Sequence, residues 1–292
     1  MNTMKRFVQI LLATLLLCIL PAALFSFDWP IPNGRALTNF SLNDNGEAER
    51  GILFISDTSV FPADAGELLF VGSNKTGGTF FHPLGNWVAL QHQDSLIGIY
   101  GHLSDLGSNS IPSLAEKATP IAKAGVSGWA NSPQLQFTVY DRKTSGYVNP
   151  QLLINMTDSK PPLIKQIILV SRDGQRVPLG QTKVVRQGSY RVYIDAVDGA
   201  DMFGNNQVAP YQFRLFMNGS LQGLLELDLL SAKNGKLQVG LRKEQSTAQI
   251  YQVDGTYLIG ELQLNRGKAL CEVIVTDTAG NEKSQTYQLM VE

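Results

Sequence analysis

The sequence predicts an all-β protein built from two successive β domains. Short runs rich in valine, isoleucine, threonine and tyrosine recur along the 292 residues, and 27 glycines and 13 prolines separate them. This mixture favours strands joined by turns over long helices. Hydrophobic residues make up 43% of the chain, which suffices for packed cores. The net charge of −1 indicates no nucleic-acid partner.

Residues 1–26 have the layout of a secretory signal peptide. A basic start at Lys5 and Arg6 precedes an uncharged apolar run over residues 7–20, and small residues follow it. The run is short for a membrane span, and no second apolar stretch is long enough to be one. We therefore expect an exported protein of the periplasm or cell envelope.

Two alternatives for this segment stay open. An uncleaved leader would anchor the chain, and this is the only membrane contact that we expect. Lipid attachment at Cys18 is the second alternative, although its neighbours Leu17 and Ile19 are bulky where lipoproteins have small residues.

The first β domain is expected over residues 46–156. An extended lead-in at 27–45, rich in proline and asparagine, precedes it, and a polar linker with two prolines follows at 157–162. The pattern predicts strands at 51–55, 68–71, 87–90 and 135–139.

Residues 163–292 predict a second, immunoglobulin-like β-sandwich domain. Strands are expected at 165–170, 190–196, 211–216 and 286–291, at the spacing typical of sandwiches. Residues 276–282 resemble the final hairpin of bacterial immunoglobulin-like domains. Cys271 lies in an alternating strand, so we interpret it as a buried apolar side chain without a disulfide partner once Cys18 is removed.

Several segments of the first domain follow one another in a characteristic order. They are 60–68, 85–92 with its apolar strand, 99–106 containing Tyr100-Gly101-His102-Leu103, 120–128, 133–139 and 146–150. Together they resemble the LytM/lysostaphin family of peptidoglycan endopeptidases over roughly residues 46–152. The resemblance implies a β-sheet domain that acts on cell-wall peptides.

The family's chemistry depends on zinc. Active members bind it through a His, an Asp four residues later, and the second His of a His-x-His motif. The first His of that motif and the His of a Tyr-x-His-Leu segment assist catalysis. Three protein ligands leave one position for a water molecule, whose pKa the metal lowers. Neighbouring imidazoles then move protons and stabilise the oxyanion.

This chain departs from that ligand set. His102 occupies the position of the family's catalytic His, but the His-x-His element reads Gln134-Leu135-Gln136. By resemblance, Glu49 takes the place of the first His ligand and Leu53 that of the Asp ligand. An amide is a poor zinc ligand and leucine is none. We therefore expect no zinc cofactor, no metal site and no catalytic residue.

The candidate binding residues follow from the same correspondence. They are Glu49, Leu53, Tyr100, His102, Trp129, Gln134 and Gln136, lining the former substrate groove. Gln134 and Gln136 either bind a glycan or peptide or simply fill the space of the lost histidines.

Three functions remain open from the sequence. The first is an inactive envelope module that binds peptidoglycan or a cell-wall hydrolase, since degenerate relatives activate amidases. The second is an active metalloendopeptidase with a rearranged site that uses His82, His92 and His102. The third is a purely structural periplasmic protein whose own side chains fill the groove.

Overall fold

A computed structural model of the chain describes residues 27–73, 82–104, 106 and 111–292. The predicted signal peptide, with Cys18, lies outside these residues. No helix in the described part of the chain has the length and apolar character needed to cross a membrane. Nearly every regular element is a strand, so the all-β prediction is confirmed.

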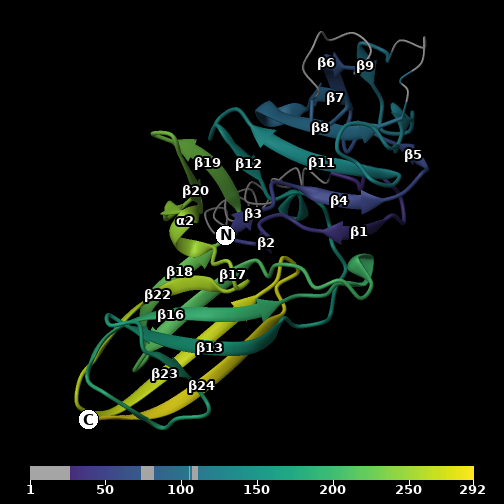
Figure 1. The fold of residues 1–292 in the computed structure, drawn as a ribbon. Helices are drawn as coiled ribbons and strands as arrows, with labels where there is room; N and C mark the ends of the chain where they lie inside the picture. Colours follow the sequence, from purple (N-terminus) through teal and green to yellow (C-terminus); the bar gives the residue numbers. More distant parts are fainter. Residues whose placement is uncertain (1–26, 74–81, 105, 107–110) are drawn as a thin grey trace, which may run out of the picture.

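Strands β1–β12 form the first domain, the upper part of Figure 1. Their bounds, with two short 3-10 turns, are β1 Arg35–Thr38, β2 Asn43–Asp44, β3 Glu47–Ala48, β4 Ile52–Ile55, β5 Ser59–Val60, β6 Gly66–Gly72, β7 Asn86–Gln91, η1 Gln93–Ser95, β8 Leu96–Leu103, β9 Leu114–Ala115, β10 Ala122–Lys123, β11 Gln134–Asp141, β12 Gly146–Val148 and η2 Pro150–Leu152. The main sheet runs in the order β12-β11-β8-β7-β6-β9, and β4 also pairs with β11.

The second domain follows from β13 to the C-terminus. Its elements are β13 Leu163–Ser171, β14 Arg176–Pro178, β15 Val184–Val185, β16 Gly188–Val197, η3 Asp201–Phe203, β17 Gln212–Met217, β18 Ser220–Glu226, β19 Leu229–Lys233, β20 Lys236–Val239, β21 Gln245–Ser246, α2 Thr247–Ile250, β22 Tyr257–Leu264, β23 Gly267–Thr276 and β24 Glu282–Val291. The sheet β14-β13-β16-β22 packs against the sheet β15-β24-β23-β17-β18.

Alternation along each strand of the second domain builds the core between these two sheets. Val192 and Ile194 point inward from β16, and Cys271 and Val273 point inward from β23. Burial raises the pKa of the Cys271 thiol to about 12, so the thiol is protonated at neutral pH. The structure thus agrees with a buried, apolar role for this cysteine.

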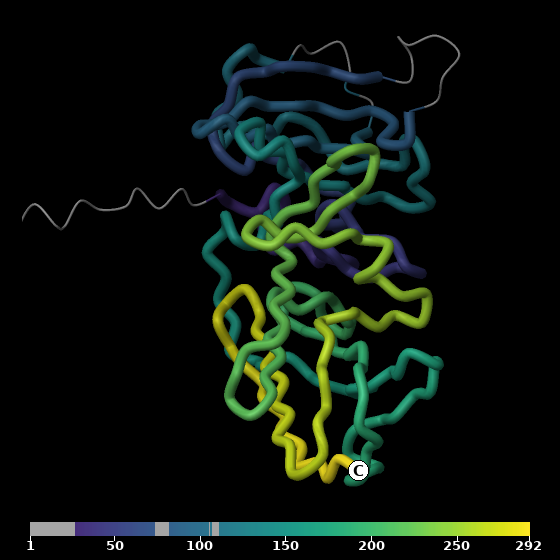
Figure 2. The backbone as a smooth tube through the Cα atoms, turned by 90° about the vertical axis from the view of Figure 1, so that its left-hand side faces the viewer, coloured from purple at the N-terminus to yellow at the C-terminus, as the bar shows by residue number. Residues whose placement is uncertain are grey.

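One hairpin of the second domain extends the sheet of the first. β19 pairs with β12 through Tyr147 opposite Leu230, and β20 and β21 continue the sheet outward. Figures 1 and 2 both show this hairpin reaching up beside the first domain. The two expected domains on either side of the linker therefore share one sheet.

The two cores also exchange side chains. Phe40, from the segment expected to be only a lead-in, is buried in the core of the second domain. Phe203 and Val208, from the loop after β16, are buried in the core of the first. The lead-in is thus structured: β1 pairs with β4, and Phe40 secures the junction.

Asn39 fixes the same junction with hydrogen bonds. Its side-chain amide donates to Gln151 Oε1 at 3.0 Å and to the Ala209 carbonyl at 2.9 Å, and its Oδ1 accepts from the Ala209 N–H at 2.9 Å. Asn39 and Gln151 are buried, so an unpaired amide here would be unfavourable.

The shared sheet predicts that the two domains unfold together. Leu230→Ala should destabilise the chain by about 2–5 kcal/mol, because Leu230 is fully buried on the strand that links them. Trp29, Trp87 and Trp129 all lie in the first domain, so urea unfolding followed by tryptophan fluorescence reports that half. The fluorescence midpoint should fall with the circular-dichroism midpoint. The exposed Leu241→Ala serves as the control, and a fluorescence midpoint unmoved by Leu230→Ala would contradict the coupling.

Candidate functional site

Strand β11 carries Gln134 and Gln136, which the sequence aligned with the family's His-x-His element. β11 lies between β4 and β8, and Gln136 is directly opposite Leu53 on one side and Gly101 on the other. Leu53 and Gln136, the residues expected at the family's Asp and second His positions, are therefore cross-strand neighbours.

Strand alternation separates the core from the candidate site. Phe54 and Phe137 point inward and are fully buried, whereas Leu53 and Gln136 are half-buried on the opposite face. Gln134 lies two residues before Gln136 and shares its face. We define the candidate site as Glu49, Leu53, His102, Gln134 and Gln136.

Glu49 reaches the candidate site from the segment just before β4. The Gln136 side-chain amide donates a hydrogen bond to Glu49 Oε1 at 3.3 Å, and the Arg50 N–H donates to the same oxygen at 2.8 Å. Gly51 makes this approach possible, because a Cβ at that position would lie 2.3 Å from the Phe137 carbonyl oxygen. The carboxylate and the amide thus satisfy each other.

His102 occupies a bulge at the end of β8. Trp87 of β7 faces both Gly101 and His102, and His102 has φ = 61°, a left-handed conformation that is unusual outside glycine. Bulges of this kind redirect side chains beside functional sites. The His102 N–H donates to the Leu84 carbonyl at 2.7 Å, which holds the bulge in place.

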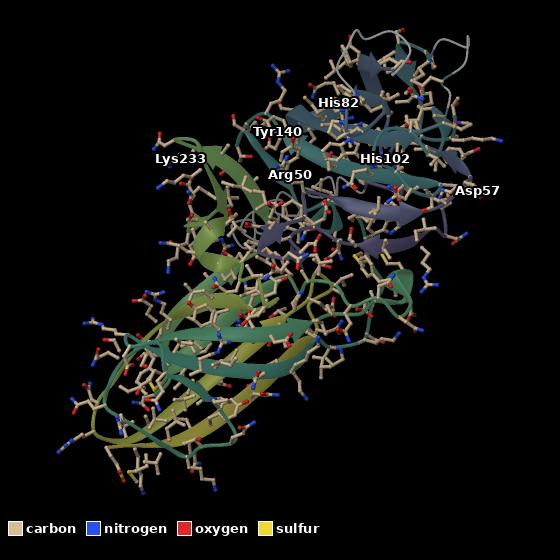
Figure 3. The ribbon with its side chains drawn as sticks, in the orientation of Figure 1. Arg50, Asp57, His82, His102, Tyr140 and Lys233 are labelled. Carbon is tan, nitrogen blue, oxygen red and sulfur yellow. The ribbon has the colours of Figure 1, made fainter. Side chains whose placement is uncertain are left out.

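The imidazole of His102 has a defined tautomer. Its Nδ1 is 2.9 Å from the Ser127 carbonyl oxygen, which can only accept, so Nδ1 carries the proton and Nε2 carries the lone pair. Burial lowers the pKa of His102, and the bond to Ser127 offsets part of this shift. Figure 3 shows His102 on the first domain between Arg50 and Asp57, which flank β4.

Trp129 lies on an exposed loop next to His102. The side chain is 72% exposed, and the Trp129 N–H donates to the Pro83 carbonyl at 2.9 Å. Ser127, which holds His102, precedes it by two residues. Two backbone hydrogen bonds between Gly125 and Gln134 close this loop at the start of β11. Trp129 is thus exposed on the loop whose Ser127 carbonyl contacts His102.

Two contacts at His102 were missed in the sequence. The Leu84 and Ser127 carbonyls are backbone groups, so side-chain type gives no sign of them. A usable signal was the glycine pair Gly85 and Gly128, both with positive φ. A Cβ on Gly128 would lie 2.1 Å from the Pro83 carbonyl oxygen and 2.4 Å from the Gly85 nitrogen. Only glycine lets these two loops cross beside His102.

Tyr100 does not line the candidate site, and that prediction is wrong. The side chain is fully buried, packs against Phe137 with ring centroids 5.2 Å apart and ring planes tilted by 34°, and accepts a hydrogen bond from the Ala63 N–H at 2.8 Å. Simple alternation would place residues 100 and 102 on one face, but the bulge at His102 breaks it.

The three histidines do not assemble into a rearranged metal site. His92 is buried, with Nδ1 3.1 Å from the Ala65 carbonyl oxygen and Nε2 3.4 Å from the Tyr100 hydroxyl. His82 lies before β7 and stacks on Trp87, with ring centroids 5.4 Å apart. Among the described residues, His82, His92 and His102 do not bring their ring nitrogens within ligating distance of a common point.

The donors at the candidate site do not fit a catalytic zinc. Such a zinc needs three ligands drawn from His, Cys, Asp or Glu. Leu53 presents only carbon, and the Gln136 amide is already bonded to Glu49. Glu49 and His102 are the remaining donors of suitable type, so the set falls short of three.

Two family models match the chain. Residues 48–150 match the model described as "Peptidase family M23", and a second model, which carries no description, matches residues 161–292. No curated protein matches the chain.

Several solved structures are similar to the chain. The catalytic domain of a prophage-encoded M23 protein from Enterococcus faecalis is 21% identical, and the match covers 43% of this chain and 95% of that one, with a TM-score of 0.35. The catalytic domain of the antimicrobial peptidase lysostaphin from Staphylococcus simulans is 20% identical, with coverages of 40% and 86% and a TM-score of 0.30. A zinc-containing peptidase from Vibrio cholerae is 21% identical, with coverages of 39% and 36% and a TM-score of 0.32.

The buried imidazole of His102 predicts an acid-sensitive structure. Because burial lowers the pKa of His102 and of His92, the unfolded chain takes up protons at a higher pH than the folded chain. The contribution of the neutral rings is therefore complete above about pH 6.5 and is lost as the pH falls below it. An NMR titration of the His102 ring should give a midpoint below about 6.5. A midpoint at or above that value would contradict this environment.

Proposed function

Because residues 48–150 are a domain of peptidase family M23, we propose that this chain is an exported cell-envelope protein whose peptidase domain is catalytically inactive. Its role is to bind peptidoglycan or to regulate a cell-wall hydrolase. The family acts on peptidoglycan, so a cell-wall ligand is the natural candidate for this domain.

The proposed loss of activity rests on one observation. Leu53 stands directly opposite Gln136, at two of the three positions where the family holds zinc. At the third, Glu49 is engaged with Gln136 rather than left free. Without a metal to polarise a carbonyl or lower the pKa of a water molecule, His102 alone offers no route to peptide hydrolysis.

The same residues support binding. Gln134 and Gln136 present amides that donate and accept hydrogen bonds, as do the hydroxyls and peptide groups of cell-wall polymers. Trp129 offers an exposed ring, and aromatic rings contribute large contact area to ligands. A strand face that no longer holds a metal thus keeps polar and aromatic groups suited to recognition.

Restoring the family's donors should restore metal binding. In the triple variant Glu49→His, Leu53→Asp, Gln136→His, three ligands face one another across β4 and β11, so we expect about one zinc per chain by elemental analysis. The unaltered chain should retain none after dialysis and should release no fragments from muropeptides with added zinc. Stoichiometric zinc together with cleavage by the unaltered chain would refute the proposal.

Binding is tested by retention on purified peptidoglycan sacculi. Trp129→Ala and Gln136→Ala should each weaken retention by about tenfold, the effect of roughly 1.4 kcal/mol expected for a lost ring or paired amide. Val253→Ala, an exposed position on the second domain, serves as the matched control.

Two other outcomes carry distinct meanings. Equal retention of all variants would place the ligand surface elsewhere. No retention of any form, with no activation of a cell-wall amidase, would favour the purely structural role, in which the Glu49–Gln136 hydrogen bond merely closes the candidate site.

A further inference from the structure

Three aspartates meet where the linker passes the second domain. Asp158 comes from the linker, Asp198 follows β16, and Asp277 follows β23. One carboxylate oxygen of each lies within 4.8 Å of the other two. These residues are far apart in sequence and play no part in the candidate site of the first domain.

Asp198 is the most unusual member of this aspartate cluster. Its side chain is 7% exposed, and its Oδ1 is buried with no hydrogen-bond partner. A buried carboxylate oxygen without a donor is unfavourable unless something else satisfies it. The Asp198 carboxylate lies beside two further carboxylates, those of Asp158 and Asp277.

In the described part of the chain, no lysine or arginine forms an ion pair with Asp158, Asp198 or Asp277. The nearby Lys160 pairs with Asp201, and its charge acts on Asp158 only from beyond ion-pair distance. Burial raises the pKa of Asp198 to about 7; a hydrogen bond from the Gly199 N–H opposes this shift, and the charges of Asp277 and Asp158 add to it. Like charges at this separation repel strongly, so the geometry calls for a positive charge from outside the chain.

Hydrogen bonds position the aspartate cluster without occupying all the lone pairs of its carboxylate oxygens. Asn281 donates through its backbone N–H to Asp277 Oδ1 and through its side chain to Oδ2, both at 2.8 Å. The same side-chain amide donates to the Asp158 carbonyl at 3.1 Å, which ties the linker to the second domain. Each carboxylate oxygen keeps a further lone pair for a ligand.

The donors select the class of ion. All three are carboxylate oxygens, which suit hard divalent cations rather than zinc or copper. Calcium binds oxygens at about 2.3–2.6 Å, so two ligands on opposite sides of one ion are at most about 5 Å apart. The spacing of the aspartate cluster fits that limit. Ligands from three separate loops also suit the irregular coordination that calcium accepts.

We propose that Asp158, Asp198 and Asp277 bind a calcium ion that fastens the linker to the second domain. The ion would lie close to the buried junction, since the neighbouring Thr278 hydroxyl accepts from Gln151 Nε2 at 3.4 Å and approaches Met156 Sδ at 3.6 Å. Calcium then stabilises the contact between the two domains. This site is independent of the state of the peptidase domain.

The test uses the full chain after removal of metals with a chelator. Isothermal titration with CaCl2 should give one ion per chain, and excess CaCl2 should raise the thermal midpoint, because an ion that binds only the folded state stabilises it. Asp198→Asn should weaken calcium binding by about tenfold or more. Asp195→Asn removes the same charge three residues earlier, on β16, where the side chain pairs with Lys165, and should bind calcium like the unaltered chain.

A stability measurement distinguishes a loss of calcium binding from a loss of folding in Asp198→Asn. In chelator, Asp198→Asn should be at least as stable as the unaltered chain, because it removes an unpaired buried charge. With calcium in excess the order should reverse. Three results would overturn the proposal: no calcium binding by the folded chain, binding unchanged in Asp198→Asn, or tighter binding of MgCl2 than of CaCl2.

Discussion

The pairing of β11 with a strand on each side is the constraint on which the first domain depends. It places Phe54, Tyr100 and Phe137 together in the core. It also fixes which residues meet on the other face, because a slip of one residue would exchange the two faces of the strand. The core that stabilises the sheet therefore also holds Leu53 opposite Gln136.

The residues at the candidate site fit the fold without a metal ion. Zinc ligands add rigidity and stability when metal binds, but they also require deprotonated, correctly oriented side chains. At this site a hydrogen bond between Gln136 and Glu49 and the carbon chain of Leu53 make no such demand. His102 keeps its bulge because backbone carbonyls from two neighbouring loops hold it. The conformation of His102 therefore does not depend on metal.

Much of the fold was accessible from the sequence because it follows from local patterns. Alternation located the main strands, and the motif order located Gln134, Gln136 and His102. Tyr100 was misplaced because a bulge of one residue leaves no mark on the apolar pattern. The pairing of β12 with β19 and the aspartate cluster were missed for a different reason. Both join residues that are close only after the chain has folded, and no local spacing reports such contacts.

The exchange of Phe40 and Phe203 between the cores has a consequence for dissection of this molecule. Cutting the chain at residues 157–162 would leave each fragment without an aromatic side chain that fills its core. The first fragment would lack Phe203, and the second would lack Phe40. The first fragment would also present the bare edge of β12, whose free backbone groups invite association with other chains. Boundaries of soluble fragments would have to follow the packing of the two cores instead of the linker. The first would need residues 198–208 and the β19–β20 hairpin grafted to it, and the second would need the segment around Phe40.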